Sequence, residues 1–278
     1  MKSSSLVVKA NRLIQASYKL DLVEQRVMEM AIAWSRAHVE DLNTDTWIEL
    51  SVKDYVDLYA SDEKSAYRQL QLAAKSLRQR TLLIEGIDDA TGNPATIETG
   101  WVSYIMYVPK SGLIRIRFSE IIVPCISRLE KQFTSFRLSA IVGLSSAYAI
   151  RLYELLKQHE KIGKRYFDIL TLREFVEANE AAYDRIDNLK SRVIDKAVEQ
   201  INQYSDLVIE YSTEKSGRNV KGFTFLITTK KPAPKTRKTT VNGNESKLLV
   251  KEVPILLSKH QQAIEDAVLS SLLKKDSA

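Results

Sequence analysis

Residues 190–211 read KSRVIDKAVEQINQYSDLVIEY, and the spacing of the apolar residues changes in the middle of this stretch. In the first half they recur at intervals of three and four, as at Val193, Ala197 and Ile201, which indicates an amphipathic helix. From Leu207 to Tyr211 they alternate, which is typical of a strand. The stretch predicts a helix that runs directly into a strand. The role of the outer face of this helix remains to be explained.

The composition is that of an ordinary globular protein. The chain has 278 residues, of which 44% are hydrophobic and 27% charged, enough for two domains with a core each. No apolar run approaches the roughly 20 residues of a membrane span, and the first residues lack the apolar core and cleavage site of a signal peptide. Cys125 is the one cysteine, which suits a reducing compartment. We expect a cytoplasmic protein.

The net charge of +6 is unevenly distributed along the chain. Residues 230–278 hold ten basic and five acidic side chains, a net +5, so residues 1–229 carry only +1. Bulk charge therefore does not identify a partner for the folded part of the chain. Any nucleic-acid interface must be argued from local faces.

The first half of the chain predicts three helices followed by strands. Asp21 and Glu24 form a capping box at the start of a helix that extends to Arg36. Ser51 caps a second helix within WIELSVKDYVDLY, residues 47–59. A third helix is expected from about Glu63 to Gln79. Strands are expected at 82–87, 101–108 and 113–118, joined by the turn sequences DDATGNPAT and PKSG.

The second half repeats this order. FDILTLREFV at 167–176 matches IELSVKDYV at 48–56 with an offset near 120, which places Leu170 on Leu50. The helix that follows aligns at an offset near 124. The other elements of the repeat are a helix at 146–159, a strand from Leu207, the turn EKSGRN and a strand at 220–227. The chain thus holds two copies of one module.

Three helices with a trailing ribbon indicate a winged helix-turn-helix, in which the third helix enters a major groove and the hairpin wing contacts the DNA backbone. The predicted fold class is α+β, with two tandem winged helix-turn-helix domains related by internal duplication at 1–135 and 136–230. Residues 231–278 are interpreted as a flexible Lys/Pro-rich linker followed by a terminal helix. The alternative is two generic α+β domains that share caps by chance.

The helix of the opening stretch has a polar outer arc that also includes residues before it. Arginine suits guanine, asparagine suits adenine, and lysine and serine reach phosphates. Asp195 and Glu199 on the same arc support the alternative, an ordinary solvated helix face. The residue composition of this helix favours a DNA-reading face and an ordinary solvated face about equally. The outer-arc candidates for DNA contact are Arg185, Asn188, Ser191, Arg192 and Lys196.

Two further groups of cations strengthen the DNA-binding interpretation. Lys215, Arg218 and Lys221 surround the Gly-containing turn of the second wing, although exposed lysines also protect edge strands. The equivalent helix of the first module points Leu72 outward, which suits neither a solvated face nor polar readout. The outward cations of that first helix are Lys64, Arg68 and Lys75.

Catalytic and metal-binding patterns are poor. His38, His159 and His260 are scattered, so no zinc site is spelled out, and no P-loop sequence is present. Twelve tyrosines offer nucleophiles, but no neighbouring group activates one. We expect no enzyme activity and no cofactor.

Three separated stretches resemble one protein family. KANRLIQASYKLDLVEQRVMEMAIA at 9–33, SSAYAIRLYELLKQ at 145–158, and LKSRVIDKAVEQINQYSDLVIEY at 189–211 together with KGFTFLI at 221–227 are similar to the plasmid replication initiators that bind iterons in theta-type replication. The likeness covers about residues 6–229 in the family's order, and the stretch after Lys230 falls outside it.

The resemblance implies two winged-helix domains that bind direct repeats of double-stranded DNA at the plasmid origin as a monomer. It implies strand opening, recruitment of the host initiator ATPase and the replicative helicase, control of plasmid copy number, and autorepression by a dimer at an inverted repeat. The N-terminal domain is the implied dimer contact. It also implies that the helix with Ser191, Arg192, Asp195 and Lys196 is the principal recognition helix.

We therefore predict a sequence-specific duplex DNA-binding protein that initiates plasmid replication and performs no chemistry of its own. The alternatives are a winged-helix transcriptional repressor without a replication role and a winged-helix protein–protein adaptor. Direct repeats beside the gene favour an initiator, whereas a single inverted repeat favours a repressor.

Overall fold

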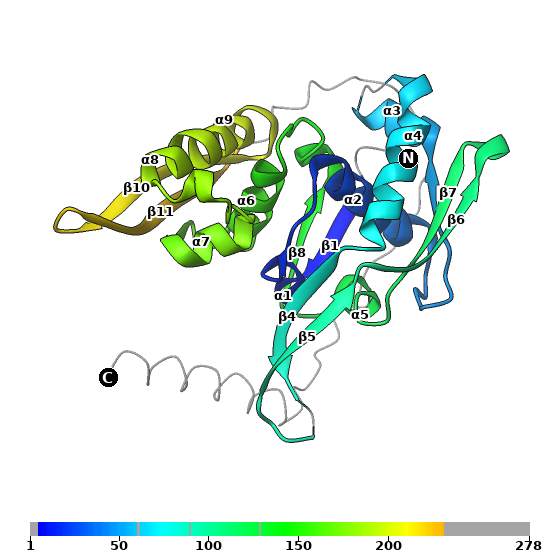
Figure 1. Ribbon diagram of the computed structural model, residues 1–278, viewed down its shortest axis with the longest axis horizontal. Helices are drawn as coiled ribbons and strands as arrows, with labels where there is room; N and C mark the ends of the chain where they lie inside the picture. Colours follow the sequence, from blue (N-terminus) through cyan, green and yellow to red (C-terminus); the bar gives the residue numbers. More distant parts are fainter. Residues whose placement is uncertain (1–4, 60–61, 89, 128, 231–278) are drawn as a thin grey trace, which may run out of the picture. The chain divides into compact units, whose positions relative to one another are not determined.

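The structure is a computed structural model that describes residues 5–59, 62–88, 90–127 and 129–230 (Figure 1). The expected tail, with its linker and terminal helix, lies outside the described residues. Within this part of the chain, no helix is long and apolar enough to cross a membrane.

The first winged-helix module is built around helix α2. Its N-terminus is fixed by the predicted capping box, in which Asp21 accepts from the Glu24 amide at 2.8 Å and Glu24 accepts from the Asp21 amide at 2.7 Å. The three helices pack against an antiparallel sheet in the order β3-β7-β6. The elements of this module are α2 (Leu22–His38), β3 (Ile48–Ser51), α3 (Val52–Tyr59), α4 (Glu63–Leu77), β6 (Val102–Val108) and β7 (Leu113–Phe118).

A hairpin is inserted between α4 and β6 of the first module. Strands β4 (Thr81–Ile87) and β5 (Pro94–Gly100) form a sheet with the short strand β2 (Ser17–Tyr18). Strand β5 includes the end of DDATGNPAT, so that sequence is a hairpin connection that continues into a strand which periodicity did not predict. Leu82 and Ile84 are buried on one face of the hairpin, while the alternating residues Thr81, Leu83 and Glu85 are exposed.

The N-terminal segment joins the two modules. Strand β1 (Leu6–Ala10) pairs antiparallel with β8 (Phe133–Arg137), so residues far apart in the chain lie side by side. Strand β8 contains residues on both sides of the predicted domain boundary at 135, and that boundary stays a prediction. The other elements of this region are α1 (Asn11–Ile14), α5 (Val123–Ile126) and η2 (Leu138–Ala140), while η1 (Pro109–Ser111) lies at the tip of the β6–β7 hairpin.

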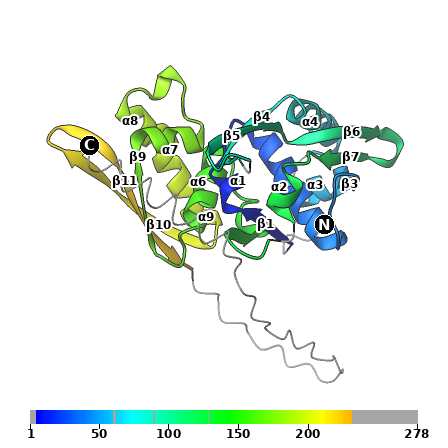
Figure 2. The same ribbon diagram turned by 90° about the horizontal axis from the view of Figure 1, so that it is seen from below.

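The second module repeats the first with a sheet in the order β10-β11-β9. Phe223, Phe225 and Ile227 of β11 are buried against its helices, as their alternation predicted. Its elements are α6 (Ala147–Lys157), β9 (Lys164–Asp168), α7 (Ile169–Val176), η3 (Ala181–Tyr183), α8 (Ile186–Leu189), η4 (Lys190–Ile194), α9 (Asp195–Tyr204), β10 (Leu207–Ser216) and β11 (Asn219–Thr229). Figure 1 shows the β10–β11 hairpin extending beyond α8, and Figure 2 shows β6–β7 extending beyond α4.

The duplication is confirmed by the sheet order, but the predicted register of its first segment is wrong. Leu50 is fully buried in β3, whereas Leu170 lies in α7 and is 77% exposed. Ser51 accepts from the amide three residues later, and Asp168 does the same in the second module, so these two caps are equivalent. Leu50 therefore corresponds to buried Phe167, three residues before the predicted partner.

A buried ionic cluster lies between β1, α2 and α6. The Lys9 ammonium donates to Glu29 and, at 2.6 Å, to Glu154. Arg151 lies 3.6 Å from Glu154, and its guanidinium is 4.0 Å from the centre of the Tyr18 ring. All four charged side chains are at most 3% exposed. Arg151 also donates to the backbone carbonyls of Ile14, Ala16 and Phe175. The cluster thus holds the N-terminal segment to the first helix of the second module.

Candidate nucleic-acid interface

The predicted second recognition helix is formed by α8, η4 and α9 in succession, and we call it the second reading helix (186–204). Its inner side is apolar and packs against α6 and β10. The residues on this side that are at most 2% exposed are Leu189, Val193, Ile194, Ala197 and Ile201. Burial of this face leaves the opposite face of the helix to solvent.

The outer face of the second reading helix carries the predicted contact residues. Arg185, at the N-cap, and Arg192 and Lys196 are all exposed. Ser191 is exposed, and its hydroxyl donates to the Asp187 carbonyl at 2.8 Å. Three of these side chains are cations at the protein surface, which suits contact with phosphate or with a base edge.

Asn188 differs from its neighbours. It is only partly exposed, and its side-chain amide donates to the Ala182 carbonyl at 2.9 Å. That bond joins the helix to the preceding 3₁₀ turn. A bidentate contact with adenine uses one N–H of this amide as donor and its oxygen as acceptor, and one of the two N–H groups is thus already engaged within the protein.

The acidic residue Asp195 has a defined partner. Its carboxylate accepts a hydrogen bond from the hydroxyl of Tyr211, at the start of the wing. Burial, followed by this hydrogen bond, raises the pKa of Tyr211 above its ordinary value, so the phenol stays a donor at neutral pH. The contact joins helix and wing, which accounts for an acid on this face without a role in DNA contact.

The second wing carries cations at its tip. Gly217 occupies the left-handed region with φ of 61°, as a tight hairpin turn requires. Lys215, Arg218 and Lys221 are exposed around that turn. The structure thus gathers the three wing residues proposed from sequence at one hairpin end.

The first reading helix is α4. Asp62 caps it by accepting from the Ser65 amide at 3.1 Å. Arg68 and Lys75 are exposed, and Leu72 is 57% exposed, so the phase of the predicted outer arc is correct. Lys64 lies in α4, but its side chain is outside the described residues. The residues buried on the inner side of α4 are Ala66, Leu70, Ala73, Ala74 and Leu77.

Lys110 is a candidate contact residue that the sequence reasoning missed. It is exposed at the tip of the β6–β7 hairpin, where Gly112 has φ of 59°. This position is equivalent to the cationic tip of the second wing. The signal is the lysine in the turn sequence PKSG, whose turn residues alone predict only a connection.

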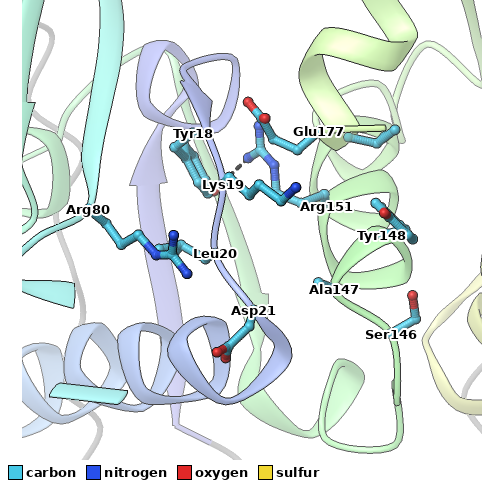
Figure 3. Close-up of a pocket in the computed structure, with 11 residues that line it drawn as sticks. Tyr18, Lys19, Leu20, Asp21, Arg80, Ser146, Ala147, Tyr148, Arg151 and Glu177 are labelled. Carbon is cyan, nitrogen blue, oxygen red and sulfur yellow. Dashed lines mark hydrogen bonds between the residues drawn. The ribbon is translucent and has the colours of Figure 1, made fainter. Parts of the chain in front are cut away.

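A cavity of about 240 Å³ lies where the two modules meet, and Figure 3 shows its lining. Its three cations are Lys19, Arg80 and Arg151. Lys19 pairs with Glu180 at 2.6 Å and Arg80 with Glu24 at 3.0 Å, while Arg151 serves the buried cluster. The cavity is therefore a junction whose charges are already matched. In the described part of the chain, no group of three or more His, Cys, Asp or Glu side chains could hold a metal ion.

Two winged helices, each with exposed cations on its third helix and at its wing tip, define a DNA-binding class of protein. The family model for "Initiator Replication protein, WH1" matches residues 6–157, and that for "Initiator Rep protein, WH2" matches residues 168–227. The chain belongs to this family of plasmid replication initiators with two winged-helix domains.

Individual relatives agree with this assignment. The chain is 27% identical over 244 residues to the PI protein of Escherichia coli, covering 77% of this chain and 80% of the relative. It is 25% identical over 223 residues to an uncharacterized 27.6 kDa protein of Escherichia coli, covering 76% and 91%. The crystal structure of Pi initiator protein in complex with iteron DNA has the same fold, with a TM-score of 0.68 at 23% identity over 84% of this chain and 100% of that one.

Proposed function

We propose that this protein binds direct repeats of double-stranded DNA at a plasmid origin and so initiates replication. The observation that carries the proposal is the exposed, charged outer face of the second reading helix, opposite a fully buried inner face. On that face Arg185, Arg192 and Lys196 lie in the same helix as three exposed acids, Asp187, Asp195 and Glu199. The matched solved fold, a Pi initiator protein, was crystallised with iteron DNA, which supports the same ligand class here.

The division of labour follows from position. Arg185, Arg192 and Lys196 lie on a helix that a winged-helix domain directs into the major groove, so they supply sequence readout and adjacent phosphate contacts. Lys215, Arg218 and Lys221 lie at the wing tip and supply phosphate contacts that fix the register. In the first module, Arg68 and Lys75 act in the same way on a second groove segment about one helical turn away.

Control of replication extends the proposal. A monomer at the direct repeats would open the origin and recruit the host initiator ATPase and replicative helicase. A dimer formed through the first module would bind an inverted repeat and repress its own gene, limiting copy number. We expect the protein to act in the bacterial cytoplasm, where its plasmid is. Support for these roles comes from family membership.

Footprinting on the DNA that flanks the gene tests the proposal. We expect protection of several direct repeats, each about two helical turns long, and loss of that protection for Arg192→Ala. Protection of a single inverted repeat alone would favour a repressor without a replication role. No protection at any flanking sequence, by a protein that is folded, would contradict sequence-specific binding.

A further inference from the structure

The second reading helix contains a π turn that the first reading helix lacks. Residues Lys190–Ile194 are π-helical, and the Asp195 amide donates to the carbonyl of Lys190, five residues earlier. Helix α4 is α-helical from Glu63 to Leu77. A π turn within an α-helix accommodates one additional residue, and such turns are frequent at functional sites.

The position of the additional residue follows from comparing the buried anchors of the two helices. We call a buried residue on the inner side of either helix an anchor. The N-caps are Asp62 and Arg185, and the first anchor follows four residues later in both helices, at Ala66 and Leu189. The last anchors also agree, since Leu70 precedes Leu77 by the same seven residues that separate Ile194 from Ile201. From the first anchor to the last, the second reading helix is therefore one residue longer than α4, and the π turn at Lys190–Ile194 is where the additional residue is accommodated.

Leu189, Val193 and Ile194 are all buried, and the π turn brings Ile194 to the same side of the helix as Leu189. In a regular helix, residues five apart point about 140° away from each other. Leu189 and Ile194 are nevertheless both at most 1% exposed. Ala66 and Leu70, four apart in α4, need no such turn.

The additional residue is accommodated on the outer face. Between the anchors, the second reading helix exposes two adjacent side chains, Ser191 and Arg192, whereas α4 exposes only Arg68. The Ser191 hydroxyl is bonded to the carbonyl of Asp187, so the exposed pair is held in place. The turn also lengthens the distance along the helix between Arg185 and Lys196 by roughly one residue's rise.

We propose that this π turn is a specificity element: its additional residue sets which bases the second reading helix contacts and makes its readout differ from that of the first. This inference rests on the proposed function and concerns the same DNA interface. The outer side chains of the two helices already differ, and the π turn adds a difference in their spacing. One inserted residue changes the spacing of the contacts without changing the core.

Deletion of Ser191 is the direct test, because it places Leu189 and Ile194 four residues apart and Arg192 at the position of Arg68. We expect the circular dichroism spectrum and affinity for scrambled DNA to be retained. Affinity for the origin repeat should fall about tenfold or more, as for loss of a good base contact. Affinities are measured by fluorescence anisotropy with the full chain.

A second variant keeps the test decisive where the deletion does not fold. Ser191→Tyr retains the residue count and adds bulk at an exposed position, so it should fold but lose affinity for the origin repeat by a similar factor. Ser212→Tyr is the matched control, since Ser212 is exposed on β10 and points away from Tyr211, which faces the helix. It should bind as the wild type does.

Arg192→Ala, measured alongside, separates the two hypotheses. Either Ser191 variant, folded and binding the origin repeat as the wild type does, overturns the specificity role of the π turn. If Arg192→Ala is weakened in that case, the proposed function stands without it. If Arg192→Ala also binds normally, the assignment of the reading helix itself is wrong.

Discussion

Replacing Lys9 with methionine perturbs the cluster that holds the N-terminal segment to the second module. The Lys9 ammonium contacts Glu29 and Glu154, and each of these side chains is at most 2% exposed. Methionine fills a similar volume without the charge. The substitution therefore leaves both glutamates buried without the ammonium, and Arg151 lies 3.6 Å from Glu154.

The size of the effect follows from this burial. Removing one partner of a buried ion pair costs about 3–5 kcal/mol, because the remaining charge has lost water and partner together. A change of 1 kcal/mol shifts the melting temperature of a domain of this size by roughly 2–4 °C. We therefore expect Lys9→Met to lower the melting temperature by roughly 6–20 °C. Because burial raises the pKa of Glu29, protonation of that side chain would place the result near the lower end.

Thermal and urea denaturation of the full chain measure this loss. Lys19→Met is the matched control, since Lys19 also pairs with a glutamate, Glu180, but is 59% exposed. An exposed pair contributes about 0–1 kcal/mol, so that variant should melt near the wild type. If Lys9→Met were no more destabilising than Lys19→Met, the cluster would not hold the two modules together.

Four further predictions concern DNA binding, pH and packing. Arg192→Ala should weaken binding to the origin repeat by about 1–3 kcal/mol and relax base preference, as read by gel shift with variant sites. Lys215→Ala should weaken binding to all sequences alike and reduce the slope of log affinity against log salt by about one. Burial raises the pKa of Glu29 from 4.5 to about 8, so the folded state binds this proton more tightly than the unfolded state does. The free energy of unfolding should therefore fall as pH rises from 4.5 to about 8, and Glu29→Gln should remove this pH dependence in urea titrations. Gly222→Ala would place a Cβ 2.3 Å from the Phe167 carbonyl oxygen and should destabilise the second sheet by about 1–3 kcal/mol in thermal melts.

Much of the helical framework was predictable because its signals are local. The capping box at Asp21 and the apolar spacing fixed the start of α2, and the same kind of pattern located α4 and α6. The alternation of Phe223, Phe225 and Ile227 likewise identified the inner face of β11. Each of these signals lies within a few residues of the element it specifies.

The parts that were missed depend on distant residues. Strand β1 includes Lys9, which is buried only because Glu29 and Glu154, 20 and 145 residues away, accept its hydrogen bonds. No local pattern announces a buried lysine. Strand β5 gives no such signal because its own side chains, PATIETG, are all exposed or half-buried, so they show no apolar alternation.

The candidate interface was predicted as a face but not in its details. A helical wheel at a fixed 100° per residue placed Arg192 and Lys196 outward, and both are exposed. The same wheel cannot show a π turn, because it assumes uniform geometry. It also could not show that Asn188 and Asp195 are bonded within the protein, since their partners, Ala182 and Tyr211, come from other elements.

The ratio of affinities for the origin repeat and for a scrambled duplex of equal length tests the central claim most directly. Fluorescence anisotropy at one stated salt concentration, with the full chain, gives both values. We predict a preference for the repeat of at least about 10³-fold, as for sequence-specific proteins in general. Equal affinities for the two duplexes would contradict sequence-specific recognition by this protein.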